Sequence, residues 1–497
     1  MASILIKNAL VYDGSGKPGF KADILVKDQR IAGVGNFSQR NADKTIDALG
    51  AAVTPGFIDI NTDSDHYLGL FSDPYQHDFI KHGVTTILGG NCGSSLAPLI
   101  TGSLNSIRKW TDINQVNVDW RTIAEFIEII RRQGLGVNFG TLVGHSTIRR
   151  GLVGESFRHL TSEEIIAFKE ILETAFQEGA FGFSTGLGYA HSRFVPYNEI
   201  KALVELTARH KRVYATHLRS ESNGLLAALN ETLSLAKDTG AKIQISHFRP
   251  LNGFKADYEK ALVMIEENAA IANVNFDLYP SDTSVVPIYT LLPEWAQQGG
   301  LEVMVDNISA PAVREKLIEE LPNVKGEDLI IAHTLPAYKF LEGKTLGEFA
   351  ANRDIKIKEA LLELMKLTGL RAVLFYKNIN FELALKFLSV PRSFISSNGA
   401  SLPDDRFKHE RYYNTFPKFF QLVKEKDLMS FELAVSKITS APARKYGIKD
   451  RGLIVEGYYA DLTVIRDNMP VDVILNGALV MENGKIEKNL NGQMLKA

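Results

Sequence analysis

The segment VYATHLRSESNGLLAALNETLSLAKDTGAKIQISH, residues 213–247, decides the fold class of this chain. Its two apolar runs, residues 213–217 and 242–247, have the length of buried strands, and residues 224–239 between them have a helical pattern. Two strands joined across a helix of this length run parallel in one sheet. The segment therefore predicts a strand–helix–strand unit of an α/β protein.

The same alternation extends in both directions from this unit. Because strands and helices keep alternating along the middle of the chain, the sequence predicts one large parallel sheet covered by helices. When such a sheet closes into a barrel, functional side chains lie at the carboxyl ends of the strands. Further strands are expected at residues 84–88, 136–143, 182–185, 274–279 and 394–397, and further helices at 122–132, 162–178, 197–210 and 257–272.

The two ends of the chain carry a different pattern of short alternating runs with turn residues between them. The Asn-Gly pairs at Asn476-Gly477 and Asn483-Gly484 are typical of two-residue hairpin turns. We expect residues 1–54 and 448–497 to form one small β-sandwich domain, with the barrel at residues 55–447. Two unrelated β-hairpins are the alternative.

The composition is that of an ordinary globular protein. The chain has 497 residues, 45% of them hydrophobic and 23% charged, and a net charge of -2. This charge gives no electrostatic reason to expect nucleic acid or an anionic membrane as a partner. The N-terminus lacks the apolar core of a signal peptide, and Cys92, the one cysteine, allows no intramolecular disulfide. We expect a cytoplasmic protein.

The predicted strands end in side chains that can bind a metal ion. One run leads into Asn91-Cys92, and three others end at His145, His217 and His247. The run at residues 394–397 leads into Asn398. A single histidine is usually structural, but several ligand types at equivalent strand ends converge on one barrel mouth. Thiolate and imidazole together favour Zn²⁺.

These motifs resemble the N-acyl-D-amino acid deacylases, the D-aminoacylase family of the amidohydrolase superfamily. The resemblance runs in order along essentially the whole chain. It implies a (β/α)₈ TIM barrel with a small sheet domain, acting on non-peptide C–N bonds. It is carried by the motifs Val53-Thr54-Pro55-Gly56-Phe57-Ile58-Asp59, Gly90-Asn91-Cys92-Gly93-Ser94-Ser95, Gly182-Phe183-Ser184-Thr185-Gly186, Thr216-His217-Leu218-Arg219-Ser220-Glu221, Asp277-Leu278-Tyr279-Pro280, Thr415-Phe416-Pro417 and Gly457-Tyr458-Tyr459-Ala460-Asp461.

The resemblance implies a metal site. In that family a cysteine and two histidines hold the tightly bound zinc, and the matching residues are Cys92, His217 and His247. Three protein ligands plus water are a catalytic zinc arrangement, in which the metal activates water and polarises a carbonyl. The alternative for Cys92 is a buried inert thiol.

Two motifs depart from the family pattern. Where the family has His-x-His on the first strand, this chain has Asn61-Thr62-Asp63. Asn is a poor zinc ligand and Asp63 a possible one, so the second, weaker metal site is expected to be lost or rebuilt and one zinc to remain. At the family's catalytic aspartate stands Asn398, and an amide cannot accept the proton of the attacking water.

Another base would then be needed, if the protein hydrolyses its ligand. The candidates are Asp63, Asp65, Asp282 and His333, and the sequence does not choose among them. His66 is also near the first motif, but on a continuing strand it would face away from Asp63.

The resemblance also implies a site for the substrate carboxylate. By position it would comprise Arg249, Tyr279 and Ser284, with Arg249 where the family usually has lysine. Arginine is the better bidentate partner of a carboxylate, which favours an N-acylated amino acid or another carboxylate-bearing amide. Residues from about 283 to 348 resemble a small insertion that the family carries near the barrel mouth.

Three functions remain open from the sequence. The first is a single-zinc hydrolase of amides like N-acyl-D-amino acids, indicated by Cys92, His217 and His247. The second is a catalytically impaired pseudoenzyme or ligand-binding protein, indicated by the changes at Asn61 and Asn398. The third, weaker one is a deaminase or cyclic-amide hydrolase, since the scaffold alone does not fix the reaction.

Overall fold

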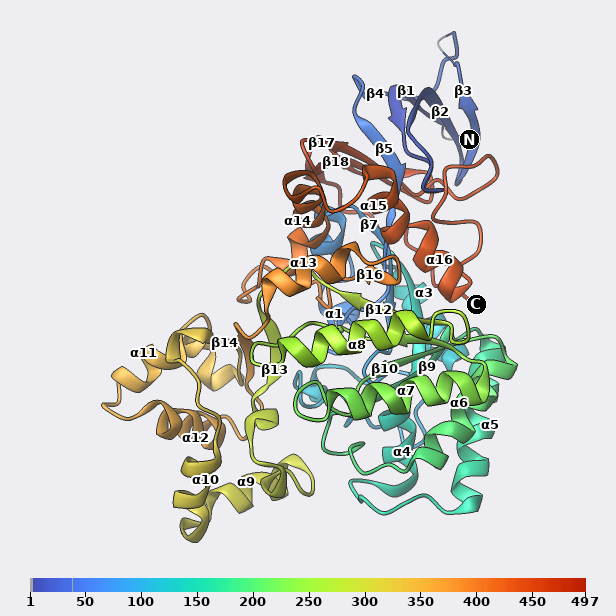
Figure 1. The fold of residues 1–497 in the computed structure, drawn as a ribbon. Coiled ribbons are helices and arrows are strands. Elements are labelled where there is room, and N and C mark those ends of the chain that lie inside the picture. Colours follow the sequence, from blue (N-terminus) through green and yellow to red (C-terminus); the bar gives the residue numbers. More distant parts are fainter. Residues whose placement is uncertain (1–2, 38) are drawn as a thin grey trace.

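A parallel barrel forms the centre of the molecule, in a computed structural model that describes residues 3–37 and 39–497. All the neighbouring strands in this sheet run parallel, which confirms the fold expected from the alternating sequence pattern. In sheet order the strands are β6 (Phe57–Asp59), β7 (Val84–Gly89), β8 (Asn138–Gly144), β9 (Gly182–Gly186), β10 (Val213–His217), β11 (Lys242–Ile245), β12 (Val274–Leu278) and β16 (Ser393–Ile395) (Figure 1).

Helices surround this barrel. Their ends follow local sequence signals: α5 (Ser162–Glu178) begins after Thr161, whose side chain forms a capping box with Glu164, and ends at Gly179 with a left-handed φ of 119°. The other helices in the strand–helix repeat are α3 (Ile123–Gln133), α4 (His145–Val153), α6 (Tyr197–Arg209), α7 (Leu225–Thr239), α8 (Lys255–Glu267) and α13 (Phe381–Ser389), and the closing helices are α14 (Arg411–Lys426), α15 (Phe431–Ile438) and α16 (Ser440–Tyr446).

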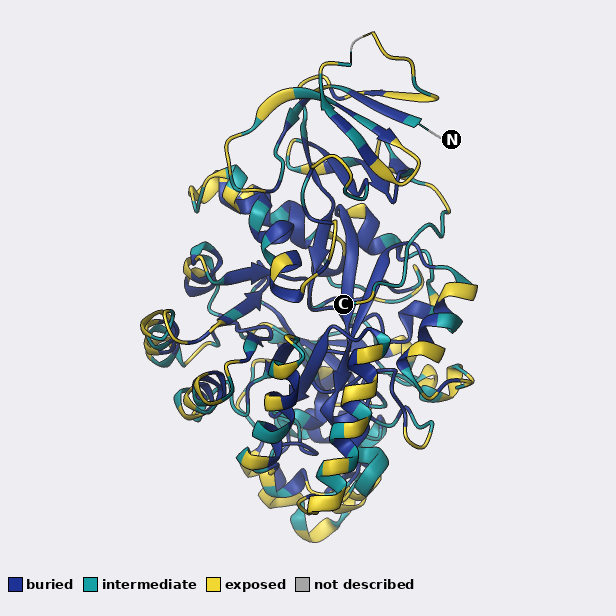
Figure 2. Ribbon diagram, turned by 90° about the vertical axis from the view of Figure 1, so that its right-hand side faces the viewer, coloured by how far each residue is buried: buried dark blue, intermediate teal, exposed yellow. Residues whose placement is uncertain are grey.

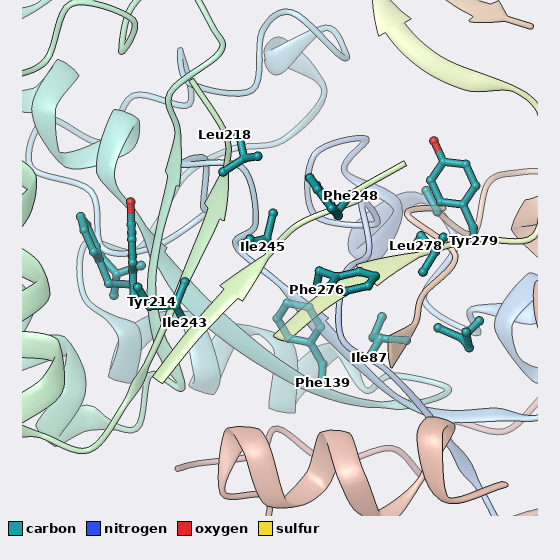
Figure 3. Packing of buried hydrophobic residues seen from close by; sticks show 14 of the residues in the cluster. Ile87, Phe139, Tyr214, Leu218, Ile243, Ile245, Phe248, Phe276, Leu278 and Tyr279 are labelled. Atoms are coloured by element: carbon teal, nitrogen blue, oxygen red, sulfur yellow. The ribbon is translucent and has the colours of Figure 1, made fainter. Parts of the chain in front are cut away.

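The strands are buried on both faces, so their apolar runs are nearly continuous. The helices alternate buried and exposed faces around them (Figure 2). Phe248, Phe276 and Phe387 cluster where α13 packs on the sheet, with ring centroids 5.3 to 5.9 Å apart. Figure 3 shows the first two among Ile245 and Leu278. Aromatic and branched side chains therefore fill the space between sheet and helices.

Strands from both ends of the chain share one sheet, as expected (Figure 1). The antiparallel pairing of β5 with β17 joins the two ends. Asn476-Gly477 and Asn483-Gly484 have positive φ at both residues, which confirms the two hairpin turns. This terminal sheet comprises β1 (Ser3–Val11), β2 (Phe20–Lys27), β3 (Arg30–Gly35), β4 (Lys44–Asp47), β5 (Ala52–Pro55), β17 (Leu462–Arg466), β18 (Met469–Leu475), β19 (Ala478–Glu482) and β20 (Lys485–Ile486).

The segment between β12 and α13 forms a separate lobe beside the barrel mouth (Figure 1). It has an antiparallel sheet of β13 (Ser284–Pro287), β15 (Val373–Tyr376) and β14 (Leu329–His333). The insertion predicted at about residues 283–348 lies within this lobe, which continues to β15. Its helices are α9 (Leu301–Ser309), α10 (Arg314–Glu320), α11 (Leu346–Ala351) and α12 (Ile357–Leu367). No helix in the described residues is both long and apolar enough to cross a membrane.

The barrel closes between its first and last strands through contacts just beyond β6 and β16. The backbone N–H of Asn398 donates to the carbonyl of Asn61 at 2.9 Å, and that of Asp63 donates to Gly399 at 2.7 Å. The buried Asp59 carboxylate accepts from the N–H of Ser397 at 3.0 Å. Burial raises the pKa of Asp59 to about 7 against the effect of these bonds. The loops after β6 and β16 are thereby fixed side by side.

His82, which follows α2 (His77–Lys81), offers a test of the core by pH. Its ring is buried against Phe79 and Phe416, and neither nitrogen has a hydrogen-bond partner among the described residues. Burial lowers its pKa from 6.5 to about 3, so below pH 6.5 the unfolded chain takes up a proton that the folded chain refuses. Acidification therefore destabilises the fold through this residue.

We expect His82→Leu to gain stability relative to the unaltered protein as the pH falls. Between pH 7 and 5 the difference in free energy of unfolding should change by about 2 kcal/mol, at about 1.4 kcal/mol per pH unit. Thermal and urea unfolding at each pH measure it. The partly exposed His210, replaced in the same way, is the control, and an equal change in both variants would contradict the prediction.

Candidate metal centre and ligand cavity

A cavity of about 530 Å³ opens at the carboxyl ends of the barrel strands, beside the inserted lobe. This is where a barrel of this kind places its reacting groups. The candidate residues of the sequence analysis that line it are Asp63, Cys92, His217, His247, Arg249, Tyr279 and Asn398.

Cys92, His217 and His247 form a cluster that can hold a metal ion. One ligand atom from each lies within 4.8 Å of the other two. The Cys92 Sγ and the His247 Nε2 are 3.3 Å apart, and the two imidazole rings are perpendicular with centroids 4.5 Å apart. The sequence analysis predicted this set, and the structure brings all three together from β7, β10 and β11.

Three residues at this rim adopt a left-handed backbone. The φ angles are 52° at Cys92, 39° at His247 and 42° at Asn398. Non-glycine residues avoid this region, at a cost on the order of 1 to 3 kcal/mol each, and such strain concentrates at functional sites. Each of these residues follows the end of a strand, and the reversed backbone turns its side chain toward the cavity.

The protonation of the cluster suits a cation. Burial lowers the pKa of His217 to about 3 even though Glu221 opposes the shift, so its imidazole is neutral and able to bind a metal. Burial and the nearby Asp63 raise the pKa of the Cys92 thiol well above its usual value. A buried divalent cation would offset the cost of the thiolate, and two imidazoles with one thiolate are donors that zinc accepts. The residues present therefore fit a metal ion.

Glu221 connects the histidines to Arg249. Its Oε1 lies 3.2 Å from His247 Nδ1 and accepts from Arg249 Nη1 at 2.8 Å, while its Oε2 lies 3.6 Å from His217 Nε2. Burial would raise its pKa, but Arg249, His217 and His247 together outweigh burial and hold the pKa below its usual range. A carboxylate behind a ligating imidazole orients the ring and raises its basicity. The sequence analysis gave Glu221 no role, although its spacing of four residues from His217 was a usable signal.

The first-strand motif has a different arrangement from a ligand pair. Strand β6 ends at Asp59, so the following residues lie on a turn. The amide of Asn61 donates to Asp277 Oδ1 at 3.0 Å, deep below the cavity. Asp63 accepts from the amide of Asn398 at 2.9 Å and lines the cavity without joining the metal cluster found among the described residues.

The other candidate bases do not line the cavity. Asp65 is buried and accepts from the N–H of Gly90 at 2.6 Å, and Asp282 bonds to Thr283 beside Lys377. His333 lies in β14 with its ring against Tyr67. Among the four candidate bases, only Asp63 contributes to the cavity wall.

His145 does not join the metal cluster, so the expectation that four strand-end ligands converge was wrong for it. It begins α4 and directs its Nε2 to Glu199 at 2.9 Å, with the ring stacked on Phe168. Burial lowers the pKa of His145, although Glu199 opposes this effect. The turn from β8 into α4 carries the side chain outside the barrel, and sequence spacing does not show this direction.

The predicted carboxylate site is partly assembled. Arg249 is buried and donates through Nε to Ser284 Oγ at 2.9 Å. Tyr279 lines the cavity, and its ring lies 4.3 Å from the guanidinium carbon of Arg411. Ser284 does not line the cavity. Its hydroxyl donates to the side chain of Asn378, which does line the cavity. Arg249 and Tyr279 thus face the cavity, and Ser284 orients Arg249.

Comparison with known proteins identifies the family. No protein-family profile matches the chain. A D-aminoacylase of Alcaligenes xylosoxydans xylosoxydans is 30% identical over 464 residues, which cover 93% of this chain and 87% of that protein. The chain belongs to the D-aminoacylase family.

Two solved members of the D-aminoacylase family share its architecture over 99% of both chains. One is a D-aminoacylase whose binuclear metal centre shows one-metal activation and second-metal attenuation, with 27% identity and a TM-score of 0.81. The other is the N-acyl-D-glutamate deacylase of Bordetella bronchiseptica with zinc and a phosphonate mimic of the tetrahedral intermediate, with 25% identity and a TM-score of 0.82. Both are metal-containing hydrolases.

Glu221→Gln tests whether this carboxylate supports the metal cluster. The amide keeps the shape but removes the charge next to His247 and Arg249. We expect metal affinity to fall by about 10- to 100-fold, the usual cost of losing such a partner. Competition with a chelator measures it. Glu231→Gln, which changes a carboxylate paired with Arg219 instead, is the matched control. Equal affinities in the two variants would contradict the role of Glu221.

Proposed function

We propose that this protein is a metal-dependent amidohydrolase that removes the acyl group from an N-acylated D-amino acid, with one zinc ion held by Cys92, His217 and His247. The observation that carries the proposal is the convergence of these three donors at the barrel mouth, within 4.8 Å of one another. Zinc bound there supplies a polarised carbonyl and water of lowered pKa.

Two observations support a single ion. Asn61 donates to Asp277 through Nδ2, and its neutral amide oxygen, which has no hydrogen-bond partner among the described residues, is a poor ligand for a second zinc ion. The carboxylate of Asp63 is engaged by Asn398 on one oxygen and lies 2.9 Å from His66 Nδ1 on the other. A neighbour in the family is activated by one metal, which makes a single-metal enzyme chemically reasonable here.

Arg249 and Tyr279 support a substrate that bears a carboxylate. Arg249 uses Nη1 for Glu221 and His247 and Nε for Ser284, and its Nη2 has no hydrogen-bond partner in the described part of the chain. A guanidinium held by three partners is oriented before a ligand arrives, which favours binding of a carboxylate. Asp63 is placed on the cavity wall to act as the base that Asn398 cannot be.

Metal content gives the first test. Protein purified without chelator should contain about one zinc per chain, since three ligands make one site. Cys92→Ala should lose the ion and the turnover of N-acyl-D-amino acids. His210→Gln, which changes a histidine far from the cluster, should keep both. If zinc-loaded protein binds N-acyl amino acids but hydrolyses none of a broad panel of them, the protein is a binding protein on this scaffold and the hydrolytic proposal is wrong.

Substituting Arg249 tests the carboxylate site. Arg249→Lys keeps one charge but loses the bidentate fork, so we expect KM for an N-acyl-D-amino acid to rise about tenfold or more with a smaller change in kcat. The comparison substrate is the same compound with its carboxylate converted to an amide. If Arg249 binds the carboxylate, the variant should lose discrimination between the two compounds, and an unchanged preference would contradict the assignment.

A further inference from the structure

Asp63 and His66 face each other across one turn of backbone. Because β6 has ended, the chain turns at residues 61–68, and the N–H of Tyr67 donates to the Asp63 carbonyl at 3.0 Å. The two side chains, three residues apart, therefore lie on the same side, with His66 Nδ1 2.9 Å from Asp63 Oδ1. Both are almost fully buried, so the contact is shielded from solvent.

The other ring nitrogen of His66 fixes where its proton lies. His66 Nε2 is 3.1 Å from the carbonyl oxygen of Ser94, which can only accept, so Nε2 carries a hydrogen. A neutral ring would then present a lone pair at Nδ1 to the Asp63 carboxylate, and two acceptors 2.9 Å apart repel. One further proton must therefore lie between Nδ1 and Oδ1. Asp63 Oδ1 lies at ion-pair distance from Nδ1, and Nδ1 has no hydrogen-bond partner among the described residues.

The surroundings of His66 support this extra proton. Burial opposes the charged ring, but the carboxylates of Asp65 and Asp63 outweigh burial and the neighbouring Lys109, so the pKa of His66 is raised. The ring is also stacked on Trp110 with parallel planes and centroids 6.1 Å apart, which holds its orientation. Trp110 and Asp63 both line the cavity, whereas His66 lies behind them.

We propose that Asp63 and His66 act as one acid–base pair, in which Asp63 exchanges a proton with the substrate and His66, a positioning residue, keeps its own Nδ1 hydrogen directed at Asp63 throughout. This inference rests on the proposed hydrolytic function. It makes Asp63 the proton acceptor that Asn398 cannot be, supported by His66, three positions beyond the first-strand motif.

With this pair, every bond and proton of the hydrolysis is accounted for. The oxygen of water forms a bond to the acyl carbon, and one water proton passes to the Asp63 carboxylate while His66 keeps its own two ring hydrogens. The C–N bond then breaks, and the proton taken from water passes from Asp63 to the leaving nitrogen, which departs as the amine. The second water proton leaves with the carboxylic acid product. The pair starts and ends each cycle in the same state.

Asn398 has a defined part in this arrangement. Its amide donates to Asp63 Oδ2 at 2.9 Å, while His66 faces Oδ1. Each carboxylate oxygen has a second lone pair, so Asp63 can still accept from a ligand in the cavity. An aspartate at position 398 would place a second negative charge against Asp63 and repel it. Asn398 thus fits a site in which Asp63 is the base.

His66→Asn tests the pair by kinetics. Asparagine can donate a hydrogen bond to Asp63 but cannot carry the positive charge of the doubly protonated ring. We expect kcat to fall by about 10- to 100-fold with KM and zinc content unchanged, and Asp63→Asn to lower kcat by about 10²- to 10⁴-fold. His333→Asn, at a buried histidine outside the cavity, is the matched control and should leave kcat unchanged.

A spectroscopic measurement tests the shared proton without turnover. In protein labelled with ¹⁵N-histidine, we expect one ring, assigned through its loss in His66→Asn, with hydrogens on both nitrogens at neutral pH. In Asp63→Asn the Nδ1 hydrogen of that ring should disappear, because its carboxylate partner is gone. A neutral His66 ring in the unaltered protein, with a bare Nδ1, would overturn the inference whether or not the protein is a hydrolase.

The two proposals fail in different ways. Unaltered, zinc-loaded protein that is inert would overturn the hydrolytic function and, with it, the pair's role in turnover. Active protein in which His66→Asn has normal kcat would overturn the pair alone. A loss of zinc in His66→Asn would also overturn it, by showing that His66 maintains the metal cluster rather than the proton.

Discussion

The hydrogen bonds that join the loops after β6 and β16 determine the geometry of everything at the barrel mouth. Asp59 holds the backbone at Ser397, and the chains at Asn61 and Asn398 are bonded directly. This junction is internal and its carboxylate is buried, so the two loops cannot shift independently without leaving a polar group unpaired. The contact between Asn398 and Asp63 spans this junction and depends on it.

The loops after the first and last barrel strands carry matched side chains. The first loop offers one amide that donates to Asp277 and one carboxylate that faces the cavity. The last strand supplies an amide that donates to that carboxylate. A donor and an acceptor are thus matched across the closure, whereas an aspartate at position 398 would set two carboxylates against each other. The metal cluster comes from residues in β10 and just after β7 and β11.

The sequence predicted the parts of the fold that depend on periodicity. The barrel strands, the helix at Ser162–Glu178 and the turns at Asn476 and Asn483 follow from apolar spacing, capping residues and Asn-Gly pairs. Three of the four expected strand-end ligands also converge. The sequence did not predict the direction of the His145 side chain or the turn that brings His66 to Asp63, because both depend on the residue at which a strand ends. A one-residue change there reverses the side on which a side chain lies.

The sheet shared by both ends of the chain has a consequence for biosynthesis. Its central pair joins β5, near the start, to β17, near the end, so this part cannot form until almost all of the chain has left the ribosome. Until then the apolar faces of β1 and β2, which bury Ile6, Ile24 and Val26 in the finished molecule, lack their partners. Pairings this distant in sequence form slowly and leave strand edges open in the meantime. The nascent protein therefore passes through a stage in which its first strands are exposed, when a chaperone has most to bind.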